Sequence, residues 1–168
     1  MVTSKRLKLT PPEFDPLDAR AARVTALDSL ARRDRPAANL RRKLLDKGFD
    51  AAVADDVVLR LQAEKLVDDR RFVENFVVFR AGRGQGPVRV RADLEALGVS
   101  SDLVEEGIDA FAHWTVALNQ ARQKKFGARL PTDYADRQRQ ARFLGYRGWS
   151  GAQIRLALSV DTDIDEDH

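Results

Sequence analysis

The sequence predicts an all-α protein built from three tandem three-helix repeats of helix-turn-helix type, arranged as an elongated curved array. Three aligned segments, residues 40–61, 90–111 and 140–159, follow one another at a spacing of 50 residues without internal gaps. Within them apolar residues recur at helical spacing, as in Val57 and Leu61. The composition, 43% hydrophobic and 33% charged, is typical of a folded protein with charged helix surfaces.

Each aligned segment has the pattern of two helices joined by a tight turn. A glycine directly after an apolar helical stretch supplies the left-handed residue that ends a helix. An aspartate or serine two residues later is a typical cap for the next helix. The glycines are Gly48, Gly98 and Gly148, and the capping candidates are Asp50, Ser100 and Ser150.

A further helix is expected before each segment, over residues 18–31, 69–80 and 115–127. These first helices differ in sequence, so their equivalence is inferred from their order. A unit of about 50 residues buries little apolar surface alone, which favours stacking of the units on one another. One globular bundle with an ancient triplication is the alternative arrangement.

Domain boundaries follow from this pattern. We expect a flexible N-terminal arm at residues 1–16 and an acidic C-terminal tail at residues 161–168, which holds five acidic residues. The repeats between them are expected at residues 17–67, 68–113 and 114–160.

The stretch "GRGQG", residues 82–86, resembles a phosphate-binding glycine loop but lacks the required context. Its spacing is not G-x-G-x-x-G, no Lys-Ser or Lys-Thr pair follows, and the preceding stretch has helical periodicity. We interpret it as a mobile corner between two helices, with Pro87 at the start of the second helix. Arg80, Arg83, Arg89 and Arg91 surround this corner and form a candidate anion-contact site.

Catalytic and metal chemistry find little support. The chain has no cysteine and only two histidines, His113 and the terminal His168, so a zinc site or a nucleophile triad is not expected. The acidic pairs at 55–56 and 105–106 share one repeat position, early in a helix, where the helix dipole explains them. We therefore expect no enzyme, no cofactor and no metal.

Positive charge is unevenly distributed despite a net charge of only +3. Residues 119–160 hold nine Lys/Arg against two Asp/Glu. Such a block indicates a polyanion as partner, or a solvated helix surface without a partner. The candidate contacts in this third unit are Lys124, Lys125, Arg137, Arg139 and Arg142. No apolar run is long enough to cross a membrane.

At three places the sequence resembles the RecX family of bacterial regulatory proteins. The stretches are "RPAANLRRKLLDKGF" (35–49), "LVDDRRFVENFVVFRAGRGQGPVRVRADLEALGV" (66–99) and "ARFLGYRGWSGAQI" (141–154). The likeness extends over residues 20–159. The middle copy departs from the family pattern, because Leu97 stands before its glycine in place of a basic residue.

The resemblance implies a non-enzymatic regulator. Separately, we expect a monomer, and the absence of cysteine fits a reducing cytoplasm. From the resemblance, the regulator would bind the RecA recombinase and lie in the helical groove of the RecA–DNA filament, with weak, sequence-independent DNA contact. There it would inhibit strand exchange, ATPase and co-protease activity in DNA repair, recombination and the SOS response. An autonomous DNA-binding protein with tandem helix-turn-helix units is the alternative. The four arginines of the middle unit and the five bases of the third are the expected contacts; the family motif covers Arg89 and Arg91 best, and the third-unit choices rest on charge alone.

Overall fold

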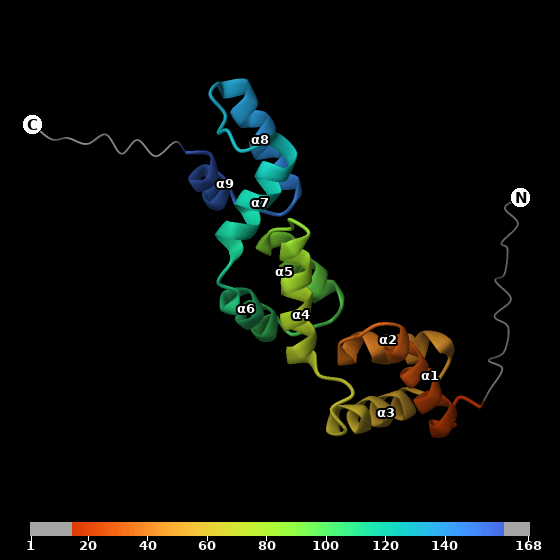
Figure 1. Cartoon of the computed structure of the whole chain (residues 1–168). Coiled ribbons are helices and arrows are strands. Elements are labelled where there is room, and N and C mark those ends of the chain that lie inside the picture. Colours follow the sequence, from red (N-terminus) through yellow and green to blue (C-terminus); the bar gives the residue numbers. More distant parts are fainter. Residues whose placement is uncertain (1–14, 160–168) are drawn as a thin grey trace, which may run out of the picture. The chain divides into compact units, whose positions relative to one another are not determined.

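The computed structural model describes residues 15–159, and this part of the chain is helical without strands (Figure 1). The expected N-terminal arm lies almost wholly, and the acidic tail entirely, outside the described residues. The chain forms two compact units, which divide between Asp69 and Arg70. The prediction of an all-α protein with three three-helix repeats is confirmed.

In its described residues, the first unit holds one repeat of three helices. These are α1 (Ala19–Arg32), α2 (Ala37–Lys47) and α3 (Ala51–Ala63). Helix α3 packs against both others, and their shared core contains the fully buried Leu40 and Leu61. Truncating such a leucine to alanine costs about 2–5 kcal/mol, so this apolar seam holds the repeat together.

The start of α2 is capped from a distance. Its N-cap residue, Pro36, offers no side-chain oxygen, and the carboxylate of Asp69 accepts a hydrogen bond from the backbone N–H of Ala37 at 2.7 Å. A free N–H at a helix start is thereby satisfied by a residue 32 positions later in the chain. This contact ties Asp69, the last residue of the first compact unit, to the start of α2.

The described part of the second unit holds six helices in two repeats. The middle repeat consists of α4 (Asp69–Gly82), α5 (Pro87–Ala96) and α6 (Ser101–Ala110). The third consists of α7 (Trp114–Phe126), α8 (Tyr134–Tyr146) and α9 (Gly151–Leu158). Phe111 and Trp114 pack against the cores of both repeats, and Trp114 meets Trp149 edge to face. The two repeats therefore share one continuous apolar interior.

The 50-residue periodicity of the turns is confirmed in the backbone. The glycines at 48, 98 and 148 all adopt positive φ, at 101°, 86° and 87°. Of the three capping candidates, Asp50 and Ser150 accept backbone hydrogen bonds at their helix starts. Ser100 makes no side-chain cap, so that prediction is wrong for the middle repeat.

The shared acidic position has a second role that the sequence analysis missed. Asp55 accepts a hydrogen bond from Arg41, and fifty residues later Glu105 accepts one from Arg91. Each pair joins the second helix of its repeat to the third. These acids therefore form ion pairs that join the second helix of a repeat to the third, and we call each such pair a staple. The pairs act in addition to any favourable interaction of the acids with the helix dipole. In the third repeat the same two positions hold Ala141 and Arg155, and the staple is lost.

The glycine corner is a joint rather than a mobile loop. Gly84 and Gly86 are buried, and the backbone N–H groups of Gly86 and Val88 donate to the carbonyls of Arg147 and Gly148 at 2.8 and 3.1 Å. The indole N–H of Trp149 donates to the Gly84 carbonyl at 3.2 Å. The expected mobility is contradicted, because this corner of the middle repeat is bonded to the last turn of the third.

Candidate polyanion-binding site

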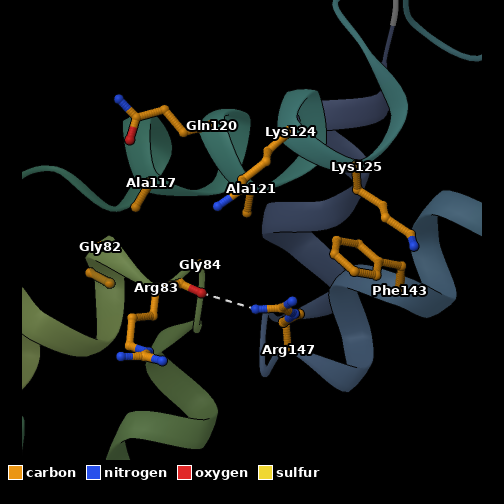
Figure 2. A pocket seen from close by; sticks show the side chains of 11 residues that line it. Gly82, Arg83, Gly84, Ala117, Gln120, Ala121, Lys124, Lys125, Phe143 and Arg147 are labelled. Atoms are coloured by element: carbon orange, nitrogen blue, oxygen red, sulfur yellow. Dashed lines mark hydrogen bonds between the residues drawn. The ribbon is translucent and has the colours of Figure 1, made fainter.

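A cleft of about 380 Å³ opens where the end of α4 meets α7 and α8 (Figure 2). Small residues form much of its wall, including Gly82, Gly84 and Ala121. The described residues that line it include four cationic side chains and no carboxylate. The cations are Arg83, Lys124, Lys125 and Arg147.

Contacts with a carbonyl or an aromatic ring fix two of these cations, and one of those contacts crosses the joint. Arg147 donates from its guanidinium to the backbone carbonyl of Arg83 at 2.9 Å (Figure 2). Its charged group also lies over the ring of Phe143, 5.1 Å from the centroid. Arg83 lies over the exposed ring of Phe79 at 5.2 Å. Both arginines are held without neutralisation, because their partners are a carbonyl and aromatic rings.

The two lysines project from the last turn of α7. That turn is followed by a loop whose carbonyls accept hydrogen bonds from the almost fully buried Arg122. The acceptors are the oxygens of Ala128 and Arg129, at 3.2 and 3.0 Å. These hydrogen bonds hold the loop against α7 and so fix the backbone that carries Lys124 and Lys125. The side chains of both lysines are exposed.

Positive potential concentrates in this cleft. Among the described residues, none of its four cations forms an ion pair with a carboxylate. Like charges gathered beside a low-dielectric wall attract anions more strongly than the same charges scattered over a surface. The arrangement suits phosphates or a run of carboxylates.

The nine cations selected from the sequence fall into three groups. Arg83, Lys124 and Lys125 meet in the cleft. Three others are held by acids: Arg80 by Asp93 at 2.9 Å, Arg139 by Asp136 at 2.6 Å, and Arg91 by Glu105. The remaining three, Arg89, Arg137 and Arg142, are exposed and lie outside the lining of the cleft.

The ion pair of Arg91 changes what that residue contributes. Its second guanidinium nitrogen also reaches Glu105, at 2.9 Å, so the contact is two-pronged. Hydrogen bonding from Arg91 holds the pKa of the Glu105 carboxyl below its ordinary value of 4.5. The equivalent pair in the first repeat lowers the pKa of Asp55 in the same way. A side chain committed to such a staple is less available to a partner.

Arg147 is the functional candidate that the sequence analysis did not select. It stands directly before Gly148, in the place that Lys47 occupies before Gly48. The sequence signal that could have identified Arg147 is that two repeats carry a basic residue at this position of the turn. What the sequence does not reveal is the neighbourhood of Arg83, 64 positions earlier in the chain.

Metal-binding clusters and membrane-spanning helices are both missing from the described residues. No group of three or more histidine, cysteine, aspartate or glutamate side chains is suitably placed for a metal ion there. In that same part of the chain, no helix is both long and apolar enough to cross a membrane.

Three models of known domains match the chain in order. They are the first, second and third three-helix domains of RecX, and they match residues 22–61, 68–108 and 116–158. The chain belongs to the RecX family. The sequence-based recognition of this family is thereby confirmed.

Curated relatives support the same assignment across most of the chain. The regulatory protein RecX of Halorhodospira halophila is 38% identical over 147 residues, which cover 87% of this chain and 91% of the relative. That of Pseudomonas savastanoi pv. phaseolicola is 39% identical and covers 83% and 90%. These relatives are named regulatory proteins.

Solved structures show the likeness of fold. The crystal structure of RecX from Lactobacillus salivarius aligns with a TM-score of 0.69 at 15% identity, covering 83% of this chain and 94% of that one. A second crystal structure, of a regulatory protein RecX, aligns at 0.67 and 16% identity and covers 83% and 70%.

Proposed function

We propose that this RecX-family protein is a non-enzymatic regulator of the RecA recombinase. It binds RecA and the helical groove of the RecA–DNA filament, and it thereby inhibits strand exchange, ATPase and co-protease activity. The proposal places it in the cytoplasm as a monomer that modulates DNA repair, recombination and the SOS response. Family membership supports the class of function, and the cationic cleft supports the class of partner.

The four unneutralised cations of the cleft are the observation on which the proposal depends. A nucleoprotein filament presents repeated negative charge, from DNA phosphates and from acidic protein surfaces. Cations that are already paired with carboxylates gain little binding free energy from such a surface. Lys124 and Lys125 have no carboxylate partner among the described residues. Docking at this cleft places both repeats of the second unit against the filament.

Autonomous recognition of DNA sequence is a weaker alternative. A recognition helix reads base edges with unobstructed polar side chains at its start. In the first two repeats the third helices carry acids there, and Asp55 and Glu105 are each bonded to an arginine. Carboxylates face phosphates unfavourably, so DNA contact is expected to be weak, dependent on salt and indifferent to sequence.

An ATPase assay tests the proposal. RecA hydrolysing ATP on single-stranded DNA is titrated with the wild-type protein and with Lys124→Glu/Lys125→Glu. We expect the wild type to inhibit, and the variant to need at least about tenfold more protein, because two attractive contacts become repulsive. The matched control is Arg20→Glu/Arg155→Glu, which changes the net charge equally at exposed positions outside the cleft.

Two results would contradict the proposal. Absence of inhibition by the wild type at a stoichiometric excess rules out the function itself. Equal loss in the cleft variant and the control variant shows that only net charge matters, and it removes the cleft from the contact surface. A helical circular dichroism spectrum like that of the wild type establishes that both variants are folded.

A further inference from the structure

A second cationic groove lies in the first unit, between α1 and α2. It has a volume of about 240 Å³, and Leu40 and Leu44, both nearly fully buried, are part of its lining. Its polar lining comes from both helices and from the turn between them. These residues are Thr25, Asp28, Ser29, Arg32, Arg35, Lys43 and Lys47.

Arg35 is the buried charge of this groove. The residue is only 8% exposed. One of its terminal nitrogens donates to the side-chain oxygen of Asn39 at 2.9 Å, and that acceptor is neutral. Among the described residues Arg35 forms no ion pair, and its buried Nε has no hydrogen-bond partner. A guanidinium withdrawn from water without an anion is costly, because nothing replaces the hydration it has lost.

The electrostatic surroundings of Arg35 add to this cost. Burial lowers the pKa of its guanidinium, and the positive charge of Arg33 lowers it further. Both effects disfavour the charged form, which an arginine nevertheless keeps at neutral pH. An anion in the groove would remove the imbalance.

Ser29 supplies a second unsatisfied donor in the same groove. Its hydroxyl oxygen is buried and has no hydrogen-bond partner among the described atoms. The neighbouring Thr25 differs, since its hydroxyl donates to the backbone carbonyl of Ala21 at 2.9 Å. Ser29 therefore retains the capacity to donate to a ligand, alongside the Nε–H of Arg35.

The rim of the groove carries further positive charge. Arg32, Lys43 and Lys47 are exposed, and none of them forms an ion pair with a described residue. Asp28 is the single acid among the described residues of the lining. With Arg35 the groove holds four cations against one anion, so a ligand with two negative charges is better matched than a single carboxylate.

We propose that this groove binds a phosphoryl group, and that the side chains of Arg35 and Ser29 turn toward it so that the Nε–H and the hydroxyl donate to its oxygens. Lys43 and Lys47 neutralise the charge from the rim. The volume exceeds that of a bare phosphate ion, which favours a phosphate ester. A nucleic-acid backbone and a free nucleotide share this chemistry. The site belongs to the first unit and is independent of the function assigned to the cleft.

Nuclear magnetic resonance of the full chain tests this proposal directly. The Nε–H signal of Arg35 is followed during titration with three probes at constant ionic strength: inorganic phosphate, a nucleoside monophosphate, and a short thymidine oligonucleotide. We expect a saturable shift of that signal and of the Ser29 amide with at least one probe. Saturation by the monophosphate assigns a free ester, and saturation by the oligonucleotide alone assigns a nucleic-acid backbone.

Variants separate binding from general attraction. Arg35→Lys keeps the charge but removes Nε, and loss of one charge-assisted hydrogen bond should weaken binding about tenfold or more. Lys43→Gln/Lys47→Gln should weaken it as well and leaves the buried residues intact. Arg20→Gln, an exposed change outside the groove, should leave the affinity unchanged.

The proposal fails if no probe gives saturation at Arg35. It fails equally if the shifts are linear and shared by exposed arginines, because that pattern reports screening rather than a site. If Arg35→Lys does not fold, the double lysine variant decides, since an unchanged affinity there contradicts the assigned rim. Inhibition of RecA by the same variants is a separate measurement and tests only the function proposed for the cleft.

Discussion

Gly86 of the middle repeat and Gly148 of the third lie in direct backbone contact. A Cβ atom on Gly86 would lie 2.3 Å from the carbonyl oxygen of Gly148, and one on Gly148 would lie 2.4 Å from the Cβ of Arg89. Each glycine is therefore required by the other repeat. The two positions are 62 residues apart in the chain.

Replacing Gly86 with alanine is expected to destabilise the second unit by about 2 kcal/mol or more, because backbone atoms must separate to admit the methyl group. Gly82→Ala is the matched control. A Cβ at Gly82 meets no atom within 4 Å, and a helical alanine is favoured over glycine. Urea unfolding monitored by tryptophan fluorescence measures both. Equal free energies of unfolding for the two variants would contradict the joint.

Trp149→Phe is expected to cost about 1–2 kcal/mol. The change keeps an aromatic ring but removes the indole N–H that donates to the Gly84 carbonyl, and it leaves that buried acceptor unsatisfied. The measurement is the free energy of unfolding of the second unit. Trp114→Phe is the comparison variant. It also removes an indole N–H, but that group donates to the carbonyl of Ile108 in α6 and not to the glycine corner. Combining Trp149→Phe with Gly86→Ala should give less than the sum of the two effects, because both act on one contact.

Arg122→Met is expected to loosen the loop after α7. The methionine has a similar length, but it leaves the carbonyls of Ala128 and Arg129 without their donor. We expect a loss of about 1–3 kcal/mol and faster amide hydrogen exchange near residues 127–130. Exchange rates unchanged from the wild type in that loop would show that the arginine does not hold it.

The stapling pairs predict a dependence of stability on acidity. Hydrogen bonds from Arg41 and Arg91 lower the folded-state pKa of Asp55 and Glu105 below the ordinary 3.8 and 4.5. The stabilisation is therefore present above those ordinary values and is lost as the pH falls through the lower, folded ones. The gap in unfolding free energy between the wild type and Asp55→Asn/Glu105→Gln should narrow in acid. A constant gap from neutral pH down to about pH 3 would contradict this.

Arg91 is expected to contribute to stability, and Arg83 is expected to contribute to binding. Arg91→Gln should lower stability with little effect on binding, because its guanidinium is committed to Glu105. Arg83→Gln should leave stability nearly unchanged and weaken inhibition of RecA, because its side chain lines the cleft without a carboxylate partner among the described residues. The measurements are urea unfolding and the ATPase assay on each variant. The reverse pattern would return Arg91 to the contact surface and remove Arg83 from it.

The helices and their turns were predictable because their signals are local. Gly48 and Gly98 end helices by adopting positive φ, a conformation in which glycine is favoured over other residues. The cap at Ser150 is likewise readable from the capping box that it forms with Gln153. Such features depend on residues within one or two turns of each other.

The site was harder to predict because it depends on distant pairs. The charge of Arg91 is visible in the sequence, but its engagement with Glu105 depends on how α5 packs on α6. Arg147 joins the cleft only because the Gly84–Gly86 corner draws the third repeat against the middle one. A glycine that is needed for close contact with a neighbouring repeat looks the same in the sequence as one that is needed for its own turn. The sequence alone therefore does not distinguish the two.

At the glycine corner, the contact between the middle and third repeats consists largely of main-chain atoms. Peptide groups are the same whatever side chains surround them. The main requirement of this contact is therefore that Gly84, Gly86 and Gly148 remain glycines. Both repeats are thus free to exchange surface residues, and to adapt to a changing partner, without altering the angle at which they meet.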